Sequence, residues 1–298
     1  MTILNFGSLN IDRTYEVDQF VQAGQTVSTF NYQEFLGGKG LNQSVALARA
    51  GADVYHVGVV GHDGGDLKQA LINNNIDATY LWEVEEHSGH TVIQIDSEGE
   101  NAILFEAGSN FSLDREMIDE VFRKFKNEKI LVLLQNEVSN VDYIIEQAAH
   151  EGHPVVFNPS PMNQEVLNLP LHLVNYFLIN ESEGQALSHK AAIEDVYTEM
   201  IKLYPESSTL LTLGSSGAKL YDQEKHYAVE AVKTQPVDTT AAGDTFTGYF
   251  LAGLIQGEDW DKVLQQAAMA SSMAISKKGA MESIPGRAEV QKRLKENK

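Results

Sequence analysis

Short runs of aliphatic and β-branched residues alternate with amphipathic helical patterns along most of the chain, and this alternation most restricts the possible folds. Strands that alternate with helices form βαβ units and a mostly parallel sheet. We therefore predict a single α/β domain over residues 1–298, with a doubly wound, mostly parallel sheet flanked by helices. The candidate strands are Ile3–Phe6, Val54–Val60, Ile130–Leu134, Val155–Phe157, Tyr176–Ile179 and Thr209–Leu213. The helical patterns begin near Asn42, Asp66, Asp114, Asn140, Glu181, Ala191, Asp244 and Asp259.

Two segments interrupt the alternation, at about 13–36 and 90–105. Each has two β-rich stretches around a turn, which is typical of a β-hairpin. Together they predict a small second sheet that acts as a lid and excludes water from a reaction site. Two surface hairpins without function remain the alternative. A small sheet also has exposed edges, which a second subunit would cover.

Composition excludes several classes of function. The formal net charge of −20 argues against nucleic acid and anionic membranes as partners. The absence of Cys excludes disulfides and thiolate metal sites and favours a cytoplasmic protein. No apolar run approaches the roughly 18 residues that a membrane span requires.

The stretch Val237–Phe246 carries the strongest chemical signal. Ala241, Ala242 and Gly243 precede an apolar helical pattern, so they should lie at a helix N-terminus. Unpaired N–H groups there can bind phosphate, and small side chains let it approach. Asp244 follows in the first turn, where a carboxylate that takes a proton would suit phosphoryl transfer to a hydroxyl. A glycine-containing turn with an aspartate N-cap is the structural alternative.

Two further glycine-containing turns have residues that suit ligand binding, and the second of them would suit a polyol. In Gly37–Asn42 the glycines allow close approach, Lys39 supplies a charge, and Asn42 offers a donor and an acceptor. Its spacing is not that of a Walker loop. Asn10 and Asp12 share one face of an extended segment after the first strand and can bind hydroxyls. Ordinary turn chemistry would explain the pair equally well.

Polar residues follow two buried strands at their carboxyl ends, where ligands bind in such sheets. Glu137 follows Ile130–Leu134, and Asn180 with Glu183 follows Tyr176–Ile179. A carboxylate and an amide can position a hydrated Mg²⁺ near phosphates. Asn180 and Glu183 also have the spacing of a helix-capping box, and both interpretations can hold together.

Taken together, these motifs are similar in order and spacing to those of the ribokinase (PfkB-type) carbohydrate kinases over the whole chain. They are Gly7–Asp12, Gly37–Asn42, Asn180–Glu183, Thr212–Gly217, Asp238–Asp244 and Lys277–Pro285. The resemblance implies ATP-dependent phosphorylation of a sugar primary hydroxyl, with Mg²⁺ and a monovalent cation, K⁺. It also implies a homodimer formed through the lid.

The resemblance also implies roles for individual residues. Asp244 would be the general base, with Ala241, Ala242 and Gly243 at the anion hole. The sugar-binding set would be Asn10, Asp12, Gly38, Lys39, Asn42, Glu137 and Asp244. The ATP and Mg²⁺ set would be Asn180, Glu183, Thr212, Gly214, Ser215, Gly217 and Gly243. The K⁺ positions would be Asp238, Thr240, Ala274, Lys277, Gly279 and Ser283.

Three positions depart from the family pattern. Ala23-Gly24-Gln25 replaces the usual Pro-Gly-Glu near the lid, Leu41 replaces a smaller residue, and Met281-Glu282 lies in the cation loop. We expect a kinase that phosphorylates D-ribose at O5. Deoxyribose, fructose or a nucleoside as the acceptor remains open, as does a non-catalytic sugar-binding protein.

Overall fold

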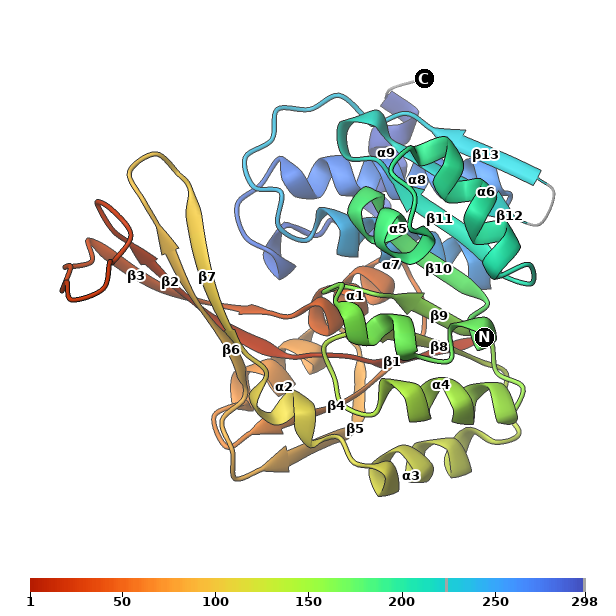
Figure 1. The fold of residues 1–298 in the computed structure, drawn as a ribbon, viewed down its shortest axis with the longest axis horizontal. Coiled ribbons are helices and arrows are strands. Elements are labelled where there is room, and N and C mark those ends of the chain that lie inside the picture. The colour runs from red at the N-terminus through yellow and green to blue at the C-terminus, as the bar shows by residue number, and fades with distance from the viewer. Residues whose placement is uncertain (223–224, 297–298) are drawn as a thin grey trace.

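The computed structural model describes residues 1–222 and 225–296. In this part of the chain the main sheet contains nine strands in the order β13-β12-β11-β10-β9-β8-β1-β4-β5 (Figure 1). From β11 to β5 all neighbours are parallel, whereas β12 and β13 are added antiparallel. The bounds are β1 Thr2–Phe6, β4 Val54–Gly61, β5 Asp77–Val84, β8 Ile130–Gln135, β9 Val155–Asn158, β10 Tyr176–Asn180, β11 Ser208–Thr212, β12 Ala218–Asp222 and β13 Lys225–Val229.

Helices cover both faces of this sheet, and each face has its own apolar core. One core is shared by α1, α2, α7, α8 and α9, and the other by α3 to α6. The bounds are α1 Lys39–Arg49, α2 Gly65–Asn73, α3 Arg115–Phe125, α4 Val141–His150, α5 Glu181–Ser188, α6 Ile193–Leu203, α7 Ala242–Ile255, α8 Trp260–Ile275 and α9 Arg287–Glu296. Short 3-10 turns are η1 Gly108–Ser112, η2 Gln164–Asn168, η3 Leu171–Leu173, η4 Gly214–Ser216 and η5 Met281–Ser283. The predicted α/β architecture is therefore confirmed.

Helix α7 lies between α1 and α8 and is buried on almost every side. A helix that is apolar all round belongs in a protein interior. Gly248 allows the close packing, because a Cβ at this position would collide with Ala46 of α1. The close approach brings the N-terminus of α7 against the first turns of α1.

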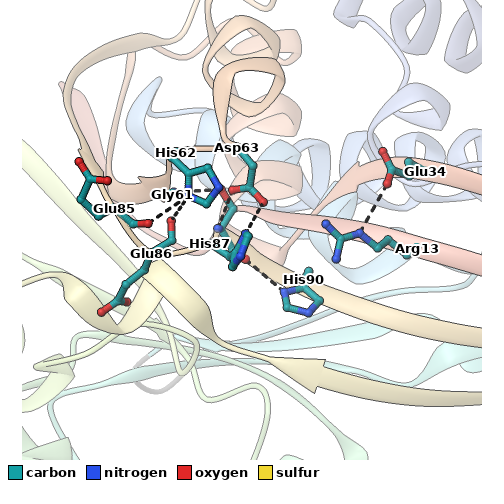
Figure 2. A network of polar contacts seen from close by, with 10 residues as sticks. Arg13, Glu34, Gly61, His62, Asp63, Glu85, Glu86, His87 and His90 are labelled. Atoms are coloured by element: carbon teal, nitrogen blue, oxygen red, sulfur yellow. Dashed lines mark hydrogen bonds and ion pairs between the residues drawn. The ribbon is translucent and has the colours of Figure 1, made fainter.

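The lid is a second sheet of four strands in the order β3-β2-β6-β7, and it projects from one side of the main body (Figure 1). Its strands are β2 Asn10–Glu16, β3 Asn31–Gly37, β6 Gly89–Ile95 and β7 Asn101–Glu106. The two predicted hairpins are present, and β2 pairs with β6 in parallel. An ion pair of 3.5 Å between Arg13 and Glu34 joins β2 to β3 (Figure 2).

The loop from β5 to the lid strand β6 is hydrogen-bonded to the loop that joins β4 to α2 (Figure 2). Nδ1 of His62 lies 3.0 Å from the carbonyl oxygens of Glu85 and Glu86, which can only accept. The N–H of Ser88 donates to Asp63 over 2.7 Å. These contacts attach the base of the lid to the main body. Within the described ranges, no group of three or more His, Asp or Glu side chains is arranged to hold a metal ion.

Strand β5 and helix α9 are not among the elements that the sequence patterns predicted. Strand β5 contains the aromatic and aliphatic residues Tyr80, Leu81 and Trp82, but it is an edge strand in which only Tyr80 and Leu81 are buried. Helix α9 buries Val290 and is otherwise mostly polar, so its periodicity is weak. Helix α1 begins at Lys39, earlier than the predicted start near Asn42. Among the described residues, no helix combines the length and apolar character that crossing a membrane requires.

Candidate active site

A cleft of about 1450 Å³ lies between the lid and the carboxyl ends of the central strands. It is lined by side chains of the lid, of the first turn of α1 and of the first turn of α7. Most residues that the sequence singled out line it together: Asn10, Asp12, Gly38, Lys39, Asn42, Glu137, Asn180, Glu183, Thr212, Gly214, Asp238, Thr240, Ala241, Ala242, Gly243, Asp244 and Gly279. Five do not line it: Ser215, Gly217, Ala274, Lys277 and Ser283.

The N-terminus of α7 presents unpaired donors to the cleft. Its N-cap, Ala241, has φ 61° and makes no side-chain capping bond. The other non-glycine residues with positive φ in the described chain are Asn or His, which tolerate this conformation better than Ala. The left-handed region costs such a residue about 1–2 kcal/mol, and strain of this kind concentrates at functional sites. In the described part of the chain, the N–H groups of Gly243 and Asp244 have no acceptor.

The first turn of α1 differs, because its donors are already occupied. Gly38 adopts φ 95°, which directs the chain into the helix. The N–H of Lys39 donates to Oε2 of Glu137 over 3.2 Å, and that of Leu41 donates to the carbonyl of Ser8 over 2.9 Å. An anion therefore finds free backbone donors at α7 and not at α1.

Asp244 is 8% exposed and lines the cleft at the third position of α7. Its Oδ2 accepts from Nδ2 of Asn42 over 3.1 Å, and its Oδ1 accepts from Nε2 of Gln43 over 2.9 Å. It caps no helix, so the capping alternative is wrong for this residue. The acid and the free N–H groups lie in one helical turn and border the same cleft.

Lys39 lies among three carboxylates of the cleft. Burial alone would lower the pKa of its ammonium group, but the negative charges of Asp244, Glu137 and Glu183 raise it. Burial raises the pKa of Glu137 and of Glu183, and Lys39 opposes both shifts. The ammonium group therefore stays charged and partly balances the acidic cleft.

The sugar-binding candidates on the lid are oriented by two residues that the sequence analysis did not identify. Nδ2 of Asn110 donates to Oδ1 of Asn10 over 2.8 Å, which leaves the Asn10 N–H groups for another acceptor. Oγ1 of Thr91 donates to Oδ1 of Asp12 over 2.6 Å. Burial raises the pKa of Asp12, and this hydrogen bond lowers it in part.

Asn180 and Glu183 form the capping box of α5, as the spacing predicted. Oδ1 of Asn180 accepts from the N–H of Glu183, and Oε2 of Glu183 accepts from the N–H of Asn180, both over 2.9 Å. Both residues also line the cleft. The capping bonds leave Oε1 of Glu183 and Nδ2 of Asn180 for other contacts.

Two loops at the α7 end of the cleft are joined by Asp238. Its Oδ1 accepts from the N–H of Thr240 over 2.9 Å, and its Oδ2 accepts from the N–H of Gly279 over 3.0 Å. The loop around η5 is held from the other side by Arg49, which donates to the carbonyls of Met281 and Ile284. These loops carry carbonyl, hydroxyl and carboxylate oxygens, the kind of ligand that hard cations prefer.

Several known proteins similar to this chain are ribokinases. A family model described as pfkB family carbohydrate kinase matches residues 2–287. The ribokinase of Haemophilus influenzae is 31% identical over 296 residues, which are 97% of this chain and 96% of that protein. The ribokinase of Cryptococcus neoformans in complex with ADP has a TM-score of 0.84 at 31% identity, covering 98% of this chain and 99% of that one. Arabidopsis thaliana ribokinase complexed with ribose and ATP has a TM-score of 0.85 at 28% identity, covering 99% and 98%.

Proposed function

The chain belongs to the pfkB family of carbohydrate kinases, and from this premise we propose that it phosphorylates D-ribose at O5 with MgATP. The family makes it a phosphotransferase with an alcohol group as acceptor. Relatives named ribokinase match it over nearly their whole length, which supports ribose as the sugar. The cleft supports the transfer, because it holds a carboxylate beside free backbone donors.

In the proposed reaction, the Asp244 carboxylate accepts the proton of the sugar hydroxyl as that oxygen attacks the γ-phosphorus. The bond between the γ-phosphorus and the bridging oxygen breaks, and ADP leaves with the electron pair. The N–H groups of Gly243 and Asp244 stabilise the charge on the transferred group. Lys39 adds a positive charge nearby. The lid excludes water, which would otherwise compete with the sugar as acceptor.

A small polyol fits the sugar end of the cleft. Asn10, Asp12 and Asn42 line this part of the cleft together. Free donors on Asn10 and the carboxylate of Asp12 provide complementary partners for further hydroxyls.

A substrate panel tests this function. ADP formation is measured with D-ribose, deoxyribose, fructose and a nucleoside, each at several concentrations with MgATP. The highest kcat/KM is expected for D-ribose. A higher value for another acceptor would assign that acceptor instead, and binding of ribose without consumption of ATP would contradict a kinase.

Mg²⁺ would enter with ATP, and Asn180 and Glu183 would hold its waters. The buried carboxylate of Glu183, which lines the cleft, fits this use. Bound Mg²⁺ supplies charge neutralisation at the phosphates.

We further propose that the loops joined by Asp238 bind K⁺ near the anion hole. The positions implied by the family are Asp238, Thr240, Ala274, Lys277, Gly279 and Ser283. Of these, Ala274, Lys277 and Ser283 do not line the cleft, so they would contribute from behind it. Glu282 extends beside Gly279 and adds a second carboxylate to these loops.

K⁺ should raise the midpoint of thermal unfolding relative to tetramethylammonium at equal ionic strength. An ion that binds only the folded protein stabilises it. The change Glu282→Gln should reduce the shift, because it removes one negative charge near the loops. Equal midpoints in the two salts, measured by differential scanning calorimetry, would contradict a K⁺ site.

A homodimer through the lid is also proposed. The apolar side chains of Phe30, Tyr32, Ile103, Leu104 and Phe105 are exposed on or beside the edge strands β3 and β7. Exposed apolar surface and open strand edges favour pairing with a second copy. Leu104→Asp should therefore halve the mass measured by light scattering. Ile201→Asp on α6, which is also exposed, is the matched control and should leave the mass unchanged.

A further inference from the structure

A group of buried amide side chains lies behind the Asp244 carboxylate. Gln43 on α1 and Gln135 at the end of β8 are both fully buried, and neither lines the cleft. Nε2 of Gln43 lies 2.9 Å from Oδ1 of Asp244, and Nε2 of Gln135 lies 2.7 Å from Oε1 of Gln43. A substrate in the cleft has no access to either glutamine, so any effect they have on the reaction passes through Asp244.

The direction of each hydrogen bond in this group is determined by a backbone carbonyl at one end. Nδ2 of Asn5 donates to the carbonyl of Gly40 over 2.9 Å, so Oδ1 of Asn5 is an acceptor. Nε2 of Gln135 donates to that oxygen over 2.9 Å and to Oε1 of Gln43. Gln43 therefore presents its N–H groups, and not its oxygen, to Asp244.

A second carbonyl gives the same orientation independently. Nδ2 of Asn158 donates to the carbonyl of Leu178 over 2.9 Å, which makes Oδ1 of Asn158 an acceptor. Nε2 of Gln43 donates to this oxygen over 3.2 Å. Amide orientation has to be assigned from the hydrogen-bond network, and here both ends of the network agree.

The network continues beyond Asn5 to a buried histidine. Nδ2 of Asn5 also donates to Oγ of Ser44 over 2.8 Å. The same Oγ lies 2.9 Å from Nδ1 of His56. On the other side of the ring, Nε2 of His56 lies 3.1 Å from the carbonyl oxygen of Gly7. Burial lowers the pKa of His56 to about 4, so the ring is neutral at neutral pH. A neutral ring that donates from Nε2 to the carbonyl accepts from Ser44 at Nδ1.

The two oxygens of Asp244 therefore have different surroundings. Oδ2 accepts from Asn42, which lines the cleft, whereas Oδ1 accepts from Gln43, which does not. We propose that Gln43 is a positioning residue that holds Oδ1 and turns Oδ2 toward the cleft as the oxygen that accepts the sugar proton. This inference rests on the proposed function, in which Asp244 is the base. The O–H bond of the sugar breaks, and its proton moves to Oδ2 as the sugar oxygen bonds to phosphorus.

Gln43→Met tests the role of the donor with a side chain of similar size. It should lower kcat about 10- to 100-fold and change the KM for the sugar less than about threefold, because Gln43 orients the base without touching the substrate. In an Asp244→Asn background the same change should have almost no further effect on kcat. Residues that act through one another give such non-additive effects.

Gln43→Glu reverses the polarity at the same position. The introduced carboxyl can still accept from Gln135, but it faces Asp244 as a second acid. Two carboxyl groups at this distance share one proton, so Asp244 would be partly protonated. The kcat of this variant should fall and should recover in part as pH rises. This alkaline shift of the pH profile would not follow from a general loss of packing.

Gln266→Met is the control, since Gln266 is a buried amide on α8 that binds Glu258 and lies outside the cleft. It should match Gln43→Met in stability loss, measured by urea unfolding, without the loss of kcat. An unchanged kcat in Gln43→Met, or an equal loss in the Asp244→Asn background, would overturn the positioning role. If Gln43→Met does not fold, a pH profile of Gln43→Glu like that of the unaltered protein overturns it. Failure of the unaltered protein to phosphorylate any sugar would instead contradict the proposed function.

Discussion

Asp244→Asn should lower kcat by about 10²–10⁴ and leave sugar binding nearly unchanged. The asparagine is almost isosteric, so the hydrogen-bonded environment at Asn42 and Gln43 can adjust with little movement. It cannot take the proton of the hydroxyl, so the attacking oxygen must lose its proton without a base. The loss therefore falls on the chemical step.

Steady-state kinetics with ADP detection give kcat, and calorimetry gives the sugar dissociation constant. Asp261→Asn is the matched control, because Asp261 also lies in the first turn of a helix, α8, but is exposed and outside the cleft. It should keep both values. Turnover of Asp244→Asn close to that of the unaltered protein would remove Asp244 from the mechanism.

Asp12→Ala should weaken sugar binding about 10²-fold, with a smaller change in kcat at saturating sugar. Hydrogen bonds to a charged group contribute about 1.5–3 kcal/mol each, and two hydroxyls would lose a partner. Thr91 would also lose the acceptor of its hydroxyl, which loosens the lid face beside the sugar. The KM for the sugar should therefore rise strongly, and the KM for ATP should stay near its original value.

Arg13→Ala provides the control for this change. Arg13 is the next residue on β2, but it pairs with Glu34 and does not line the cleft. Its removal should leave the KM for the sugar within about twofold. An Asp12→Ala enzyme with an unchanged KM for every sugar of the panel would exclude Asp12 from binding.

The cleft is acidic, so electrostatic repulsion opposes the binding of ATP. ATP brings several negative charges to a site that already contains Asp12, Glu137, Glu183 and Asp244. The backbone donors of α7, the charge of Lys39 and the cations that accompany the nucleotide must offset this repulsion. The net charge of −20 is thus compatible with an anionic substrate only because the favourable groups are concentrated at one end of the cleft.

Local patterns in the sequence were sufficient for the fold class, because periodicity, caps and turns depend on neighbouring residues. The alternation of strands and helices predicted the parallel sheet, and the small residues before Phe246 predicted the N-terminus of α7. The spacing of Asn180 and Glu183 predicted their capping box. The two hairpins of the lid followed from the same kind of signal.

Only the tertiary structure decided which donors remain free and how the base is oriented. The turns at Gly37–Asn42 and Ala241–Gly243 both begin helices, but Glu137, in the turn after β8, occupies a backbone donor at α1 across 98 residues of sequence. Gln43 reaches Asp244 across 201 residues, and Gln135 and Asn158 come from separate strands to direct its amide. Such contacts depend on strand order and on the packing of α7 against α1, which periodicity along the chain does not contain.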